Sequence, residues 1–174
     1  MTGPIPRPLD VRSLPANGYE EAIRADEAER AALASANGIE AVELFEATVR
    51  AIAWGAEGVR VDGSVRARVV QSCVITLEPV RNEIDEPIDA VFVPEGSAFA
   101  RGTDDGEIVI DAEGDDAPET FRLPTLDLGA VAAEFFSLAL DPYPRRKDAK
   151  LPTAATDAPT GAFASLAALK AKDG

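Results

Sequence analysis

Few side chains of this sequence belong to the types that carry out catalysis or bind metals. The 174 residues include one cysteine, Cys73, in the stretch VVQSCVITLEPV at residues 69–80, and no histidine. A Ser-His-Asp or Cys-His relay is therefore impossible, and the side chain that titrates most readily near neutral pH is missing. The composition excludes the enzyme classes that depend on such a relay.

Cys73 is open to three interpretations. A redox sensor or nucleophile requires a lowered thiol pKa and access to solvent. A structural zinc site requires four thiolate or imidazole ligands, which one cysteine and no histidine cannot supply. The third is a small apolar residue in a buried strand, since free cysteine is among the most buried residue types. The β-branched neighbours favour this third interpretation, so we predict an inert core residue that is shielded from thiol reagents.

The densest group of carboxylates lies between Arg101 and Glu119. Their spacing does not match the D-x-D-x-D-G pattern of a calcium loop with its later glutamate. We favour a charged, solvated loop, which can also bind a basic protein partner. A metal-dependent hydrolase or nuclease is the enzymatic alternative, and it would need these acids to converge rigidly. No cofactor is predicted. The acids are Asp104, Asp105, Glu107, Asp111, Glu113, Asp115 and Asp116.

Three arginines in the middle of the chain form a candidate contact for phosphate groups. Arg66 and Arg68 are two residues apart and therefore share one face of a strand, while Arg60 lies on the preceding run. The alternative is a solvated sheet face paired with the acidic loop, and we favour it.

A second group of cations lies near the C-terminus and precedes a short amphipathic segment. This group is either part of a frayed terminus or the basic linker of a short docking helix that touches RNA or an acidic surface. The residues concerned are Arg145, Arg146, Lys147 and Lys150, followed by Phe163, Leu166 and Leu169.

Charge is unevenly distributed over a chain whose formal net charge is −14. Residues 1–144 hold 11 basic and 28 acidic side chains, whereas residues 145–174 hold 6 basic and 3 acidic ones. A polyanionic body argues against broad, nonspecific binding to nucleic acid and favours basic protein partners. RNA contact would be confined to a local basic patch or to the tail.

The sequence also indicates the compartment. No apolar stretch approaches the roughly 18 residues of a membrane helix, and the start MTGPIPRPLD carries prolines and Arg7 where a secretory signal has an apolar region. A lone cysteine cannot form an internal disulfide, which fits a reducing environment. We predict a cytoplasmic protein without a membrane span.

The first part of the chain predicts an arm followed by a helix. Residues 1–18 are rich in proline and suit an extended arm with a strand at about 5–11. Asp26 as N-cap, Glu29 as its capping-box partner and the Asn37-Gly38 stop predict a helix over about 27–36.

Alternating hydrophobicity then predicts an antiparallel meander. Its β-rich runs are residues 41–54, 58–77 and 83–93. In the second run, Val65, Ala67, Val69, Gln71 and Cys73 fall on one face. Glu78 and Pro79 indicate the end of that strand, because proline cannot donate to the ladder.

Residues 94–124 are rich in glycine, proline and acid and predict a mobile loop, in which EIVID is a candidate short strand. A second helix follows, with Asp127 as N-cap and Pro142 ending it. Asp127 and Gly129 therefore mark a helix start rather than a site. The predicted core face of this helix contains Val131, Phe135, Leu138 and Ala139.

These elements predict an α+β fold in one domain over residues 1–144, with an antiparallel β-meander packed by two main helices. Both an open sheet and a curled, barrel-like one are compatible with the pattern. A basic, flexible tail over residues 145–174 completes the chain, ending in the short amphipathic segment.

Three segments together resemble the YceD family of large ribosomal RNA subunit accumulation proteins. They are QSCVITLEPV at 71–80, LDLGAVAAEFFSLALDPYPRRKDA at 126–149 and GAFASLAALK at 161–170. The residues that carry the resemblance, which we expect to be mostly structural, are Gln71, Cys73, Glu78, Pro79, Asp127, Leu128, Gly129, Pro142 and Tyr143.

The resemblance implies a non-enzymatic factor that supports accumulation or processing of large-subunit ribosomal RNA. Such a factor would bind RNA, a ribosomal protein or another assembly factor, and a generic protein-interaction domain is the alternative. Many relatives carry two cysteines separated by two residues at the equivalent strand end. Here Thr76 stands in the second position, so this chain does without whatever the pair does in relatives.

Overall fold

Three long strands form the centre of the structure. In the computed structural model, which describes residues 3–97 and 118–150, they are β3 (Ala41–Trp54), β4 (Gly58–Ser72) and β5 (Pro79–Pro94). β3 pairs antiparallel with β4, and β4 pairs antiparallel with β5. The predicted meander is confirmed.

One further strand extends the meander beyond the prediction. β2 (Tyr19–Arg24) pairs antiparallel with β3, so that Ile23 lies opposite Ala47. At the other border, β6 (Glu119–Phe121) runs parallel to the last residues of β5. The sheet order is β2-β3-β4-β5-β6, and its two border strands do not pair with each other. The sheet is therefore open.

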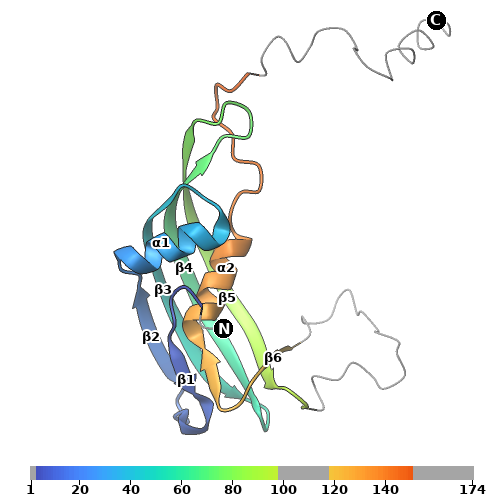
Figure 1. Cartoon of the computed structure of the whole chain (residues 1–174). Coiled ribbons are helices and arrows are strands. Elements are labelled where there is room, and N and C mark those ends of the chain that lie inside the picture. The colour runs from blue at the N-terminus through green and yellow to red at the C-terminus, as the bar shows by residue number, and fades with distance from the viewer. Residues whose placement is uncertain (1–2, 98–117, 151–174) are drawn as a thin grey trace, which may run out of the picture.

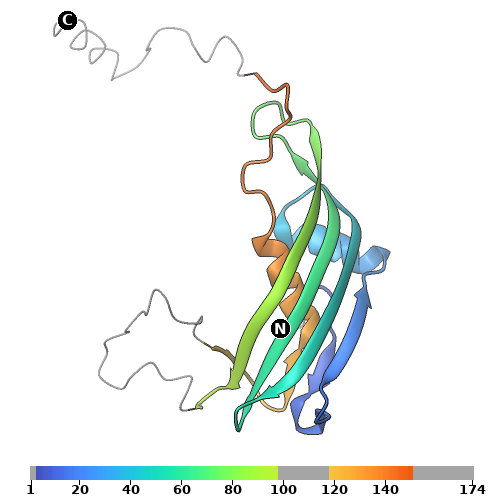
Figure 2. The same ribbon diagram turned by 180° about the vertical axis from the view of Figure 1, so that it is seen from behind.

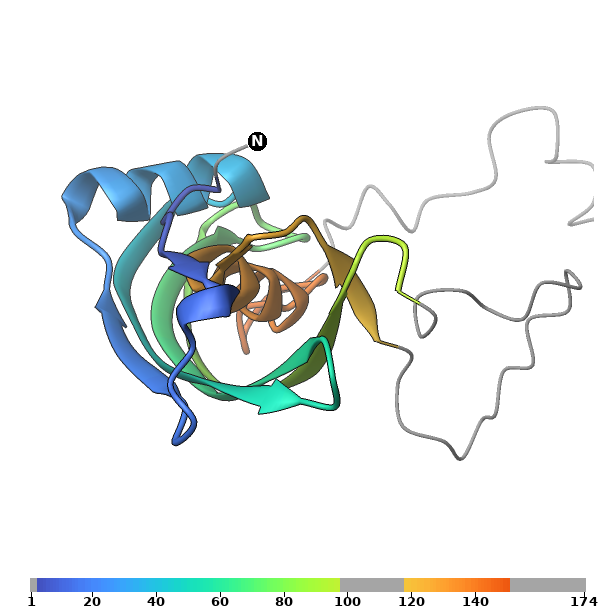
Figure 3. The same cartoon turned by 90° about the horizontal axis from the view of Figure 1, so that it is seen from below.

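The sheet curves around the second helix. Figure 3 shows the strands wrapped about α2 (Leu128–Leu138), which lies on the concave side. Alternation along β4 explains which face turns inward, because Val65, Ala67 and Val69 are buried while Arg66 and Arg68 between them are exposed. This distribution agrees with the predicted faces of the strand, and the α+β class is confirmed.

The first helix, α1 (Glu27–Asn37), agrees with its prediction at both ends. Asp26 accepts a hydrogen bond from the Glu29 backbone N–H, and the Glu29 side chain accepts one from the Asp26 N–H, which completes a capping box. Gly38 ends the helix in the left-handed conformation with φ of 62°. Leu33 and Ala34 are buried where α1 packs on β3.

The buried face of α2 differs from the predicted one. Leu128, Val131, Ala132 and Phe136 point into the core, and the Phe136 ring meets Phe45 edge-to-face at 5.5 Å between centroids. Leu138, predicted on the core face, is exposed, and Phe135 is only partly buried. The helix ends at Leu138, before the predicted stop at Pro142. Apolar residues occur on several sides of this helix, so periodicity alone placed the stripe wrongly.

The turn between β4 and β5 also differs from the prediction. β4 ends at Ser72, so Cys73 lies in the turn rather than in the strand. The Cys73 N–H donates to Glu78 O at 2.8 Å, and the Leu77 N–H donates to Cys73 O at 2.9 Å. Pro79 therefore opens β5 instead of ending a strand. Proline suits this first position because no backbone N–H is needed there for a hydrogen bond to the neighbouring strand.

The N-terminal arm docks onto the start of α2. Its strand β1 (Pro8–Asp10) is followed by a short 3₁₀ turn, Val11–Ser13, and pairs with β7 (Thr125–Asp127) in a separate two-stranded sheet. A strand was predicted here over a longer range. Ile5 ahead of it is fully buried.

Part of the prediction lies outside the described residues. This applies to the acids at 104–116, the candidate strand EIVID and the tail beyond residue 150. β6 falls inside the range predicted as loop, and a cis Leu123–Pro124 peptide bond lies between β6 and β7. Among the described residues, no helix has the length and apolar character needed to cross a membrane.

Gly129 leaves no space for a side chain where the arm crosses α2. A Cβ at this position would collide with the Ile5 carbonyl oxygen and lie 2.9 Å from the Ile5 carbonyl carbon. The arm cannot retreat, because Leu128 N–H donates to Arg7 O at 2.9 Å and Arg7 N–H donates to Asp127 Oδ1 at 2.8 Å.

We predict that Gly129→Ala lowers the free energy of unfolding by about 1 kcal/mol. The clash involves backbone and costs about 1–3 kcal/mol, which outweighs the roughly 1 kcal/mol that alanine gains over glycine in a helix. Gly3→Ala is the matched control, because its Cβ would meet Ala130 Cβ at an ordinary 3.5 Å. Urea unfolding followed by circular dichroism measures both. Equal stability of the two variants would contradict the proposed close approach.

Candidate functional site

The motif segments at 71–80 and 126–149 meet at one end of the molecule. The turn at 73–78 lies beside the chain that follows α2, and the Val74 N–H donates to Pro144 O at 2.9 Å. Arg146 Nη1 donates to Glu78 Oε2 at 2.9 Å. Figures 1 and 2 both show the green turn next to the orange segment at this end. We call the turn 73–78 together with residues 141–148 the apical junction.

Gln71 fixes the base of the apical junction. Its side chain is buried, its Nε2 donates to Asp141 O at 2.9 Å, and its Oε1 accepts from Asn82 Nδ2 at 2.9 Å. A buried amide is stable only when its polar atoms are bonded. Gln71 therefore holds the segment after α2 against the ends of β4 and β5, in agreement with a structural role.

Cys73 is fully buried, as predicted, but its thiol is not an ordinary one. The Thr76 hydroxyl, with the backbone N–H groups of Arg146, Thr76 and Ile75, lowers the pKa of Cys73 to about 6. Hydrogen bonds to the charged form favour the thiolate, and here they outweigh the opposing effect of burial. These hydrogen bonds thus favour the thiolate form of a residue that is shielded from solvent.

The outer surface of the apical junction combines apolar and cationic side chains. Leu77 is 77% exposed, Tyr143 is 71% exposed and Val74 is 45% exposed. Among the described residues, Leu77 is also the only non-glycine residue with a positive φ, at 60°. Such a conformation is sparsely populated and costs about 1–3 kcal/mol. The turn therefore holds a large apolar side chain in water at an energetic cost.

Several cations follow Tyr143 in the chain. Arg145, Lys147 and Lys150 are exposed, whereas Arg146 also binds Asp148 with Nε 3.1 Å from Oδ1. Asp148 beside this guanidinium has a lowered pKa. Pro142 is exposed in the same segment. Tyrosine and arginine are enriched at macromolecular binding surfaces, and exposed apolar side chains beside them add area that a partner can bury.

Sequence reasoning named Tyr143 and the cations of this surface but missed Leu77 and Val74. The β-branched run VVQSCVIT predicted one continuous strand through the turn, which would have placed both residues inside a sheet. The available signal was the Glu78-Pro79 pair, which opens β5 and requires a reversal just before it.

The arginine stripe lies on the convex face of the sheet. Arg60, Arg66 and Arg68 all project from β4, rather than from two runs. Arg60 Nη2 lies 2.7 Å from Asp89 Oδ2, and Arg66 Nε lies 3.3 Å from Asp85 Oδ2. Carboxylates of β5 therefore face these arginines on a solvated surface. The predicted partners were the acids of the loop at 104–116, which lie outside the described residues. Exposed pairs of this kind contribute little to stability.

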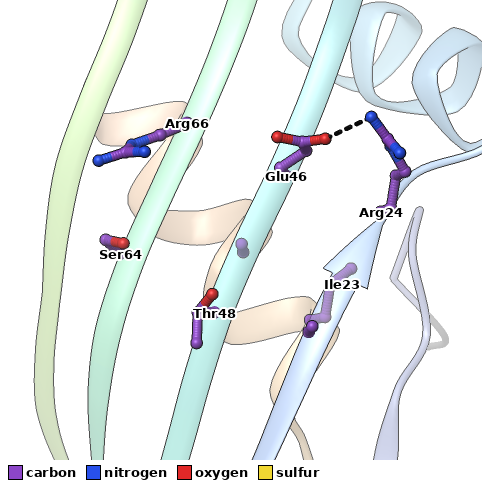
Figure 4. A pocket seen from close by; sticks show the side chains of 8 residues that line it. Ile23, Arg24, Glu46, Thr48, Ser64 and Arg66 are labelled. Carbon is purple, nitrogen blue, oxygen red and sulfur yellow. Dashed lines mark ion pairs between the residues drawn. The ribbon is translucent and has the colours of Figure 1, made fainter.

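An open groove of about 540 Å³ runs beside Arg66 on the same face. Figure 4 shows Arg24 and Glu46 paired at one side of it, with Nη2 and Oε1 2.7 Å apart. Ser64 and Thr48 line its floor. Opposite charges alternate along the groove, so it offers neither an enclosed chamber nor a uniformly basic track.

The remaining motif residues build the start of α2. Asp127 Oδ1 accepts from the N–H groups of Gly129 and Ala130 at 3.0 and 3.1 Å, and Leu128 is fully buried. This arrangement supports the helix-start interpretation. The predicted contacts Phe163, Leu166 and Leu169 lie outside the described residues. In the described part of the chain, no three ligand-type side chains gather as a metal site would require.

Comparison with known proteins identifies one family. The family model described as large ribosomal RNA subunit accumulation protein YceD matches residues 61–170, from within β4 into the tail. The comparisons with curated proteins and with solved structures give no match.

We predict that the thiol of Cys73 titrates near pH 6 in the folded protein. The ultraviolet absorbance of the thiolate measures this directly, because the chain has a single cysteine. Thr76→Val removes the strongest donor and should move the midpoint towards the ordinary value of 9.0. Thr48→Val on the convex face is the control and should leave the midpoint unchanged. A wild-type midpoint near 9 would contradict the proposed donor set.

The lowered pKa of Cys73 also makes the free energy of unfolding depend on pH. Because the folded pKa lies below the unfolded one, Cys73 stabilises the fold above pH 9 and loses this contribution as pH falls through 6. The stability of wild type relative to Cys73→Ala should therefore decrease from pH 9 to pH 6 in urea titrations. Burial predicts in addition that a thiol reagent alkylates native protein more slowly than unfolded protein.

Proposed function

The chain belongs to the YceD family of large ribosomal RNA subunit accumulation proteins, and from this premise we propose that it acts without catalysis, by binding a partner at the apical junction. Membership of the family connects the chain with accumulation of large-subunit ribosomal RNA. The partner and the binding surface are our proposal. We place this activity in the cytoplasm, where large-subunit RNA is assembled in bacteria.

The observation that carries the proposal is the convergence of two motif segments on one exposed apolar patch. Residues 71–80 and 141–149 meet through the Val74–Pro144 and Arg146–Glu78 hydrogen bonds, and they leave Leu77 and Tyr143 in solvent. A partner that covers these two side chains removes apolar area from water. Tyrosine and arginine are enriched among the residues that dominate binding energy.

A non-catalytic role is supported by the chemistry that the chain offers. The sequence has no histidine, and its one thiol is buried behind the turn. The grooves on the convex face are open to solvent and lined by paired charges. These features suit contact with a large partner better than conversion of a small substrate.

Two classes of partner fit different parts of the molecule. Ribosomal RNA fits the exposed Arg145, Lys147 and Lys150 beside Tyr143, because cations and an aromatic ring bind phosphate and bases. A basic ribosomal protein or another assembly factor fits the acidic body. A pull-down of tagged protein with and without ribonuclease separates the two. Recovery of partners unrelated to ribosomes would favour a generic interaction domain.

We predict that the double variant Leu77→Ser, Tyr143→Ala fails to restore large-subunit ribosomal RNA in cells that lack the gene. Loss of two exposed contacts at the centre of a binding patch should reduce partner recovery at least about ten-fold. Stability should hardly change, since both side chains are largely solvated. Quantification of large-subunit RNA and of pulled-down partners measures the effect.

Leu123→Ser is the matched control, because Leu123 is also an exposed leucine but lies in the turn between β6 and β7. It should restore the RNA fully. If the double variant also restored it, the apical junction would not be the binding surface. If deletion of the gene left large-subunit RNA unchanged, the proposed process itself would be wrong.

A further inference from the structure

A long stretch of β5 has a pairing partner on one side only. β4 pairs with β5 from Pro79 to Phe92, whereas β6 reaches only Phe92, Val93 and Pro94. Figure 2 shows β5 as the border of the sheet above β6. Within the described part of the chain, no backbone group bonds to residues 83–91 from this side. Nine residues of strand, about 30 Å, are thus open to a further strand. We call residues 83–91 the β5 edge.

The odd-numbered residues of the β5 edge present their backbone groups outward. The Glu95 N–H donates to Phe121 O across the border at 2.9 Å, and backbone direction alternates along a strand. The register between β4 and β5 has no shift, so the alternation continues to Glu83. The outward N–H donors are therefore those of Glu83, Asp85, Asp89 and Val91.

Proline placement supports this assignment. Pro79 and Pro87 both fall at odd positions of β5, where the missing N–H would have pointed away from β4. Pro87 removes one outward donor but keeps its carbonyl acceptor. The edge is therefore interrupted at one donor and remains a template over the rest of its length.

Charges on the convex face alternate from strand to strand and end in acids at this edge. One row runs Arg24, Glu46, Arg66 and Asp85 across four neighbouring strands, with ion pairs at its first and last steps. The Asp85 side chain is 68% exposed at the end of the row. The next row ends similarly, with Arg68 opposite Glu83. Both rows end in an acid at the border of the sheet. A lysine or arginine on an added strand would continue the alternation of charge.

We propose that the β5 edge receives an extended segment of a basic partner protein as an added strand, in which lysine or arginine alternates with apolar residues. The basic side chains would lie on the convex face opposite Glu83 and Asp85. The apolar ones would lie on the concave side, near the half-buried Ala90. This surface is separate from the apical junction and goes beyond the proposed function.

The charges along the β5 edge favour a basic peptide over a second copy of the chain or RNA. A second copy of the chain pairing edge to edge would bring its own Glu83, Asp85 and Asp89 against the same acids, and like charges directly opposite are destabilising. RNA is repelled by the same carboxylates. A basic peptide would lie next to the carboxylates of β5, because the arginines of β4 are one strand farther from the border.

The test uses the full chain and a blocked nine-residue peptide of alternating lysine and valine. Fluorescence anisotropy measures its affinity, and amide hydrogen exchange by nuclear magnetic resonance locates it. Binding should protect the outward amides of Glu83, Asp85, Asp89 and Val91, which exchange readily beforehand. A peptide with glutamate in place of lysine should not bind. A peptide with N-methyl groups on its lysines should not bind either, because residues opposite Glu83 and Asp85 exchange backbone hydrogen bonds with them in an antiparallel pairing.

Two variants separate charge from backbone. The pair Glu83→Gln, Asp85→Asn should weaken binding about five-fold, as expected for two cross-strand charge pairs. Val91→Pro should weaken it by removing an outward donor without changing any charge, while leaving the β4 ladder intact. Glu46→Gln, in the same charge row but two strands away, is the control and should bind normally.

Equal binding of the glutamate peptide, or binding without protection of the four outward amides, would overturn the proposal. The proposed function is tested independently in cells. If the peptide fails to bind and the junction double variant still loses large-subunit RNA, only the β5 edge is wrong. If the peptide binds as expected and the junction variants restore the RNA, only the proposed junction surface is wrong.

Discussion

The carboxylate of Asp127 is the contact on which the rest of the structure depends. One oxygen accepts the N–H groups of Gly129 and Ala130 at the helix start and that of Arg7 from the arm. Arg7 in turn binds Glu29 with Nη1 2.8 Å from Oε1, which lowers the pKa of Glu29 and ties the arm to α1. These bonds fix where α2 begins inside the curved sheet. They therefore also fix where its following segment meets the turn at 73–78.

The parts of the fold that follow from local chemistry were predictable. The capping box of α1 and the alternating faces of β4 depend on residues close together in the sequence. The buried face of α2 was not predictable in this way. Phe136 is buried and Leu138 is exposed because Phe136 packs against Phe45, which lies far away in the sequence. β2 was missed because glutamates at 20 and 21 interrupt its apolar alternation.

The candidate site divides in the same way. Motif residues such as Gln71 and Tyr143 were recognisable in the sequence, but their meeting depends on bonds from Gln71 to Asp141 and from Val74 to Pro144. Leu77 is exposed because it lies in a turn, and the β-branched residues around it predict a strand there instead. The pairing of Arg66 with Asp85 required the register of β4 and β5, which no local signal specifies.

The position of α2 inside the sheet has a consequence for how the chain is made. Synthesis completes β5 at Pro94, whereas the helix that fills the concave face begins at Leu128. At about 5–20 residues per second, the ribosome needs a few seconds to supply it. During that interval each nascent chain holds a row of valines and Phe45 without their cover. The apolar concave face of the sheet thus lacks its covering helix while the chain is still attached to the ribosome.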